Sequence, residues 1–117
     1  TWVKSSLDKK IELQIVSDQY RTPTFVSDLI QGVLNVIKMK KYGLYHISSG
    51  EVLSIYEIVC NIAECCGFNP TLIKKINSGR LNQIAQRPID STLSIEKAIK
   101  ELDFCPTTLN NALKKIL

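Results

Sequence analysis

Apolar residues recur every three to four positions in several segments of the chain, which is the spacing of one face of an α-helix. The helix predicted most strongly begins at Ser54 and ends before Gly67. Ser54 and Glu57 fit the S-x-x-E capping box that begins a helix, and a glycine commonly follows the last turn. Further helices are predicted over residues 1–10, 26–41, 94–102 and 107–117. The first of these carries Trp2, a residue of the buried type, which suggests that more chain precedes it; a natural N-terminus is the competing interpretation.

The predicted helix over residues 26–41 has the most regular apolar stripe. The stripe follows the i, i+3, i+4, i+7 pattern and comprises Val26, Leu29, Ile30, Val33, Leu34 and Ile37. Asp28 lies in the first turn, where the helix dipole favours a negative charge, and we interpret it as a helix charge rather than a general acid. A stripe of this kind is typical of a helix that packs on a core.

Alternating apolar and polar residues predict short strands at residues 12–16 and 44–48. His46 lies inside the second strand and is expected to be packed and hydrogen-bonded rather than catalytic. Residues 69–88 have no clean period, although residues 72–76 within them fit a short helix or a strand, and long irregular stretches are often functional. The pattern as a whole predicts a small α/β domain with short strands and about four helices.

Composition and charge narrow the class of protein. The 117 residues include 44% hydrophobic and 22% charged residues, which is typical of one globular domain. The net charge of +4 is spread along the chain, whereas a nucleic-acid binder usually concentrates it on one face, so we expect no nucleic-acid partner. No apolar run reaches the ~18–20 residues of a membrane span, so we expect no membrane partner.

The residue types that commonly hold metals and cofactors do not form their usual patterns. The four cysteines make no C-x-x-C pair and only one histidine could join them, so we expect no metal site and reduced thiols, as in a cytoplasmic protein. None of the five glycines lies in a G-x-G-x-x-G turn or a P-loop. No tyrosine is followed by a lysine at the fourth position, and we assign no catalytic residue.

The most interesting polar residues lie in two irregular stretches. Arg21 and Arg87 are each close to a proline on separate loops, and an arginine presents a planar fork of donors that suits phosphate oxygens. Thr24, Asn82 and Gln83 could add neutral hydrogen bonds to a sugar or a base. Two interpretations stay open: the two arginines clamp a diphosphate, or they tie loops to carbonyl or carboxylate groups.

Several ordered pieces of the sequence resemble the dTDP-4-dehydrorhamnose reductase family of extended short-chain dehydrogenases. Residues 16–29 resemble its D-Q-x-x-x-P-T turn followed by an aromatic residue, Val and x-Asp-Leu. Residues 43–47 resemble its G-x-Y-H-x strand, and residues 53–58 the helix that follows. Residues 87–97 resemble its R-P-x-x-S-x-L-x-x-x-K stretch, and residues 103–106 its closing G-[FW]-x-P segment with Asp in place of Gly. The resemblance covers nearly the whole chain.

This resemblance implies a two-lobed enzyme. In such proteins a larger N-terminal Rossmann lobe binds NADPH or NADH and carries a catalytic Tyr-x-x-x-Lys pair, and a smaller C-terminal lobe binds the sugar nucleotide. Residues 1–117 resemble the smaller lobe alone, as a single substrate-binding domain of a longer chain that lacks its N-terminal Rossmann domain. The implied partners are a nucleotide-linked sugar and the missing lobe, with a homodimer as one open assembly.

The resemblance also implies roles for the two arginines. Arg87 matches the arginine of the R-P stretch, which contacts the diphosphate in related sugar-nucleotide epimerases. Arg21 departs from many of the reductases, which have Gly there, and agrees with epimerases that use an arginine on the same diphosphate. The first function predicted is reduction of a dTDP-4-dehydro-6-deoxy sugar in dTDP-rhamnose biosynthesis, with an epimerase or dehydratase as the alternative. A non-catalytic binding subunit is a further alternative, since the regulatory subunit of methionine adenosyltransferase resembles the same family.

Overall fold

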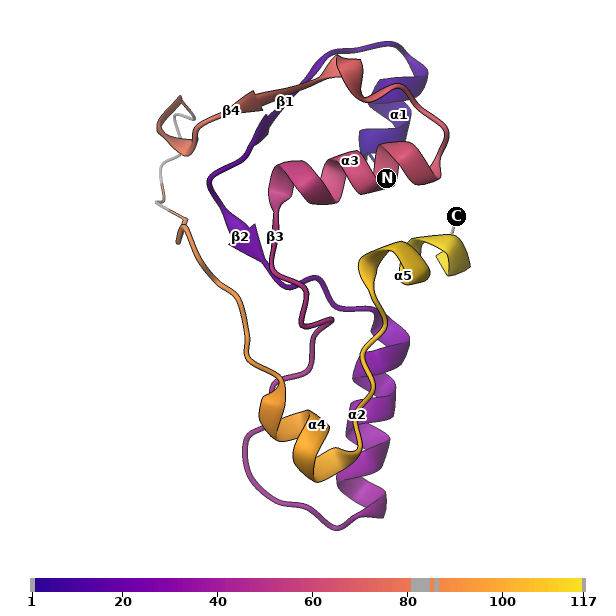
Figure 1. Ribbon diagram of the computed structural model, residues 1–117, viewed down its shortest axis with the longest axis vertical. Helices are drawn as coiled ribbons and strands as arrows, with labels where there is room; N and C mark the ends of the chain where they lie inside the picture. The colour runs from indigo at the N-terminus through magenta and orange to yellow at the C-terminus, as the bar shows by residue number, and fades with distance from the viewer. Residues whose placement is uncertain (1, 81–84, 86, 117) are drawn as a thin grey trace.

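The computed structural model describes residues 2–80, 85 and 87–116. It is an elongated α/β domain measuring 49 × 31 × 18 Å (Figure 1). The elements in chain order are α1 (Trp2–Asp8), β1 (Leu13–Val16), β2 (Tyr20–Arg21), α2 (Val26–Lys38), β3 (Leu53–Ser54), α3 (Ile55–Cys65), η1 (Pro70–Leu72), β4 (Ile73–Ile76), η2 (Ser78–Arg80), α4 (Glu96–Leu102) and α5 (Leu109–Ile116). Figure 1 shows α1, α3 and the β1–β4 pair at one end, α2 and α4 at the other, and α5 between them. The predicted α/β class is confirmed.

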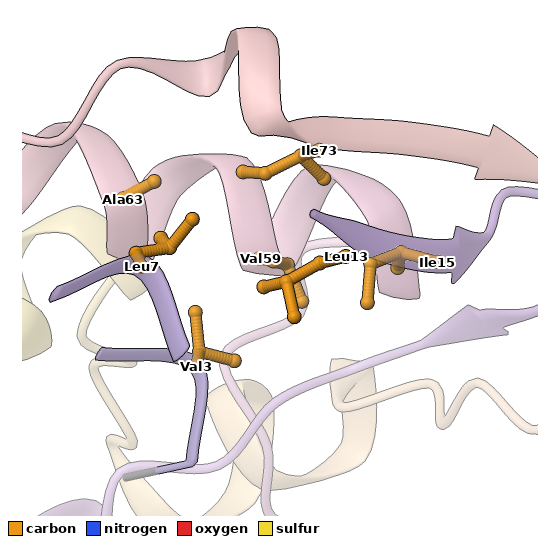
Figure 2. Close-up of a cluster of buried hydrophobic side chains, with 7 residues drawn as sticks. All are labelled: Val3, Leu7, Leu13, Ile15, Val59, Ala63 and Ile73. Carbon is orange, nitrogen blue, oxygen red and sulfur yellow. The ribbon is translucent and has the colours of Figure 1, made fainter. Parts of the chain in front are cut away.

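The upper end of the molecule is built on two parallel strands. β1 pairs with β4 from Leu13 opposite Ile73 to Val16 opposite Ile76. Because α1 and α3 each turn an apolar face toward this pair, their side chains close a common core (Figure 2). Its buried members are Val3, Leu7, Leu13, Ile15, Val59, Ala63 and Ile73. Of the two alternatives for residues 72–76, the strand is confirmed, since β4 covers Ile73–Ile76 and Leu72 is the last residue of η1.

The start of α3 confirms the capping box. The Ser54 hydroxyl accepts a hydrogen bond from the Glu57 backbone N–H at 3.1 Å, and the Glu57 carboxylate accepts from the Ser54 N–H at 2.7 Å. These bonds from Ser54, first the one from its backbone, hold the pKa of Glu57 below its usual value. The helix therefore begins where two otherwise unpaired backbone donors are satisfied.

The lower end has a smaller core between α2 and α4. Ile95, Ala98, Leu102 and Phe104 are buried there, and Tyr45 and Ile47 pack against them. A Cβ added at Gly32 of α2 would lie 2.9 Å from the Cδ1 atom of Ile47, so the Ile47 side chain packs directly against the helix at this position. This close approach is possible because the only glycine of α2 has no side chain.

Two expectations from the sequence are wrong, one about pairing and one about burial. Residues 44–48 form no strand, since no described segment pairs with them, although Tyr45 and Ile47 do face the core while Leu44 is 75% exposed. His46 is exposed rather than packed. α1 buries Val3 and Leu7 and leaves Trp2 61% exposed, so the expectation that more chain precedes Trp2 stays a prediction.

The apolar stripe of α2 also faces away from the core of this chain. Its six side chains, which run from Val26 to Ile37, are 42–66% exposed. The buried residues of α2 are Asp28 and Gly32, on another face of the helix. The helical periodicity is confirmed, but the side that packs within this domain is a different one, which also carries Val36 against the lower core. Among the helices that the structure describes, none is long and apolar enough to cross a bilayer.

Candidate functional site

The candidate site is a layer of three extended segments below the β1–β4 pair. Tyr20 and Arg21 of β2 pair antiparallel with β3 on one side. On the other side, the Tyr20 N–H donates to the Ile89 carbonyl at 2.7 Å, and the Ser91 N–H donates to the Tyr20 carbonyl at 3.3 Å. β2 is therefore the middle segment, and it lies between the start of α3 and residues 88–93.

Arg21 uses its guanidinium to hold this layer together. Its Nη1 group donates to the Tyr20 carbonyl at 2.6 Å and to the Pro88 carbonyl at 3.2 Å. Its Nη2 group donates at 3.2 Å to Oε1 of Gln19, a side chain that is only 3% exposed. Of the two interpretations left open by the sequence, the structure shows for Arg21 the contacts of an arginine that ties loops to carbonyl groups.

Arg87 directly precedes Pro88, whose carbonyl accepts a hydrogen bond from Arg21. It is exposed, and Pro88 fixes the backbone that follows it. The bond from Arg21 to the Pro88 carbonyl thus places the backbone of Arg87 next to the segment that carries Arg21, 66 positions earlier in the chain. Thr92 and, to a smaller extent, the charge of Arg21 hold the pKa of the neighbouring Asp90 below its usual value.

The remaining predicted site residues are not part of this contact network. Thr24 donates its hydroxyl to the Ile47 carbonyl at 3.4 Å and lines a cavity of 280 Å³ between the start of α2 and α5. The other cavity residues are mainly apolar side chains of α5 together with Pro23, Phe25 and Val26. Asn82 and Gln83 lie outside the residues that the structure describes.

Two acidic residues have structural roles that spacing alone did not reveal. The Asp18 carboxylate accepts from the Ser78 N–H at 3.0 Å and from the Ser78 hydroxyl at 2.8 Å, which ties the end of β1 to the end of β4. The Ser78 backbone bond, followed by the hydroxyl bond, lowers the pKa of Asp18. Asp18 and Arg21 therefore fix Ser78 and Pro88, so one short loop holds both ends of the segment that contains Arg87.

Asp28 is the second such residue. It is 7% exposed and accepts from the Thr107 N–H at 2.7 Å and from the Thr107 hydroxyl at 2.8 Å. The Glu51 carboxylate accepts from the N–H of Leu109 at the first residue of α5. Both carboxylates hold α5, which agrees with the interpretation that Asp28 is not a general acid.

The described residues do not fit a nicotinamide dinucleotide. In dinucleotide-binding folds a glycine-rich turn follows a parallel strand and leaves room for a pyrophosphate. Here β1 leads into Ser17 and Asp18, and the Asp18 carboxylate occupies the turn and is bonded to Ser78. All four cysteines are free thiols, and no group of three or more metal-ligating side chains gathers in the described part of the chain.

The comparison with known families decides what this fold is. Residues 2–117 match the family described as the RmlD substrate binding domain. The chain belongs to this family. The RmlD substrate binding domain shares 33% identity over 110 residues with the spore coat polysaccharide biosynthesis protein SpsK of Bacillus subtilis, covering 94% of this chain and 38% of SpsK. The resemblance read from the ordered motifs is therefore confirmed.

Solved structures show the same fold. A dTDP-4-dehydrorhamnose reductase from Bacillus anthracis in complex with NADP matches with a TM-score of 0.85 at 21% identity over 97% of this chain and 40% of that one. A dTDP-4-dehydrorhamnose reductase from Clostridium acetobutylicum matches with a TM-score of 0.84 at 26% identity over 98% and 42%. A UDP-glucuronic acid 4-epimerase from Bacillus cereus matches with a TM-score of 0.71 at 25% identity over 96% and 35%. The RmlD substrate binding domain thus spans about two fifths of the two reductases.

Proposed function

We propose that this domain is the C-terminal, sugar-nucleotide-binding lobe of a larger NAD(P)-dependent oxidoreductase that reduces a dTDP-4-dehydro-6-deoxy sugar. The observation that carries the proposal is the fold match to two dTDP-4-dehydrorhamnose reductases, one of them in complex with NADP. In this proposal an N-terminal Rossmann lobe binds the cofactor and supplies hydride chemistry, and residues 1–117 hold the substrate. This division of roles agrees with the turn after β1, where the Asp18 carboxylate, bonded to Ser78, stands in place of a glycine-rich turn for the cofactor.

The exposed stripe of α2 supports a partner lobe. An apolar surface of this kind marks an interaction site more often than a solvated face. The chain covers only 38–42% of SpsK and the two reductases, so in a parent of similar length the larger part of the protein is available to cover this face.

In the proposed site, the two arginine-bearing segments form an anion pocket for the diphosphate. Arg87 is exposed and carries a permanent charge next to a fixed backbone, as a direct phosphate ligand requires. Arg21, Thr24, Asn82 and Gln83 are the further residues that we assign to the substrate side. The chain's task in catalysis is to bind the nucleotide and orient the sugar carbon toward the cofactor lobe.

Calorimetry on the full-length parent tests the pocket. We expect Arg87→Gln to weaken dTDP-sugar binding by about 10- to 150-fold, because a hydrogen bond to a charged group contributes ~1.5–3 kcal/mol. Lys100→Gln on α4 removes the same charge from an exposed position away from the site and should leave the affinity unchanged. An Arg87→Gln affinity within twofold of the native value would overturn the pocket.

The reaction is tested separately, by following NADPH at 340 nm with a dTDP-4-dehydro-6-deoxy sugar. Stoichiometric oxidation of NADPH with formation of the 4-hydroxy sugar supports the reductase. Conversion of a nucleotide sugar to its epimer or dehydrated product without net use of NADPH supports the alternative that the arginine at position 21 and the likeness to an epimerase favour. Binding without any turnover would overturn both and leave a binding subunit.

A further inference from the structure

We propose that Arg21 is a positioning residue, which strengthens anion binding by holding the segment that carries Arg87 rather than through its own contact with the anion. The inference rests on the proposed function, because it assigns a division of labour within the proposed diphosphate pocket. Its basis is the set of hydrogen bonds that Arg21 already makes within the domain.

Most of the donor capacity of Arg21 is directed inward. A guanidinium group has five N–H donors, two of them on each Nη atom. Both donors of Nη1 have protein acceptors, the carbonyls of Tyr20 and Pro88, and one donor of Nη2 bonds Gln19. An anion that took these donors would release the Pro88 carbonyl and with it the segment next to Arg87.

The acceptors of Arg21 connect the segment to a rigid part of the fold. The Gln19 side chain is 3% exposed, and its backbone carbonyl accepts from the N–H of Ile55, the first residue of α3. Since α3 packs in the main core, the contacts run from that core through Gln19 and Arg21 to Pro88.

The bond to Pro88 bears directly on the direction of Arg87. Proline has a fixed φ angle and restricts the residue before it to extended conformations. Holding the Pro88 carbonyl therefore also restricts where the Arg87 side chain can reach. After Pro88 the segment is held separately, by the bond from Tyr20 to the Ile89 carbonyl and by the bond from the Leu93 N–H to the Thr22 hydroxyl at 3.2 Å. Loss of Arg21 should consequently loosen the Arg87 end and leave residues 89–93 in place.

A double-mutant cycle on the full-length parent tests this role, with dTDP as the calorimetric probe. We expect Arg21→Gln and Arg87→Gln each to weaken dTDP binding at least tenfold, and the double variant to bind no more than twofold more weakly than Arg87→Gln alone. Two arginines that each contact the anion would instead multiply their losses. Multiplied losses would overturn the positioning role while leaving the proposed pocket intact.

Arg21→Lys separates charge from geometry. Lysine keeps the positive charge but cannot reproduce the three fixed bonds to Tyr20, Pro88 and Gln19. We expect Arg21→Lys to bind dTDP as weakly as Arg21→Gln, with thermal unfolding within about 2 °C of the native parent as evidence of an intact fold. Native affinity in Arg21→Lys would overturn the proposal, and so would native affinity in Arg21→Gln.

Gln19→Leu provides a variant that cannot touch the anion, because the side chain is buried. It removes an acceptor of Arg21 and should weaken dTDP binding three- to tenfold in the native background but not in the Arg87→Gln background. An equal loss in both backgrounds would overturn the path through Arg87. If Arg87→Gln itself retains native affinity, the proposed pocket fails together with the positioning role, an outcome distinct from multiplied losses.

Discussion

Asp28 is the residue through which α2 holds the start of α5, and replacing it measures that attachment. Asp28→Ala removes two charged hydrogen bonds, from the Thr107 N–H at 2.7 Å and from the Thr107 hydroxyl at 2.8 Å. Each bond of this kind contributes ~1.5–3 kcal/mol, and Thr107 is only half-buried, so water can replace part of the loss. We expect the free energy of unfolding to fall by about 3 kcal/mol.

The conservative variant should show a smaller effect. Asp28→Asn keeps one carbonyl oxygen as an acceptor and loses the charge, and we expect a loss of about 1.5 kcal/mol. Ser27→Ala replaces the exposed neighbour in the same helical turn and should stay within about 0.5 kcal/mol of the native protein. Both comparisons therefore separate the bonds of Asp28 from the helix propensity of the first turn.

Urea unfolding followed by circular dichroism measures these differences, provided that the m-value stays constant. A double-mutant cycle with Thr107→Val isolates the pair. Because both substitutions remove the same bonds, the double variant should lose clearly less stability than the two single losses added together. Additive losses, or an Asp28→Ala variant within about 0.5 kcal/mol of the native protein, would refute the assignment of Asp28 as the attachment point of α5.

Two further predictions concern the loops around the site. The bonds from Ser78 lower the pKa of Asp18 in the folded protein, so its contribution to stability is present above its ordinary pKa and is lost as the pH falls through the lowered folded value. Asp18→Asn should therefore flatten the fall in melting temperature between about pH 5 and pH 2. An unchanged pH profile of the melting temperature would contradict the bond. Gly50 has a φ of +73° and a Cβ there would lie 2.8 Å from Cδ1 of Ile95, so Gly50→Ala should lower the free energy of unfolding by about 1–2 kcal/mol. Gly79 has neither a positive φ nor a neighbour within 4 Å, and Gly79→Ala in the same urea experiment should lie within about 0.5 kcal/mol of the native protein, so equal effects at the two positions would argue against strain.

The parts of the fold that local chemistry determines could be predicted from the sequence. The capping box at Ser54 and the stop at Gly67 define α3 within a few residues, because the groups that begin and end a helix are neighbours in the chain. β1 was likewise visible from its alternation. The pairing of β1 with β4 was not, because parallel partners lie far apart in sequence and their register depends on the whole core.

In the candidate site, too, the sequence indicated local features but not the contacts between distant residues. Spacing and composition selected Arg21 and Arg87, but only coordinates could distinguish an arginine that ties loops from one that clamps an anion. The contact that favours the loop-tying role for Arg21, its bond to the Pro88 carbonyl, joins residues 67 positions apart. The carboxylate pairs of Asp18 with Ser78 and of Asp28 with Thr107 have no sequence signature either, since an acidic residue and a hydroxyl far apart in the chain do not form a recognisable motif.

The partner of the apolar face of α2 could not be read from its periodic pattern. Apolar spacing along a helix reports the surface that the helix buries in the complete protein, and it does not identify the partner that covers that surface. Within this domain α2 attaches through Asp28, Gly32 and the amide of Asn35, which donates to the Leu102 carbonyl at 2.8 Å. Among the described residues these contacts leave the stripe exposed, so the face that packs within the domain and the apolar face are different sides of one helix. The prediction of the helix and its stripe is confirmed, and the exposed stripe is the surface that the proposed second lobe would cover.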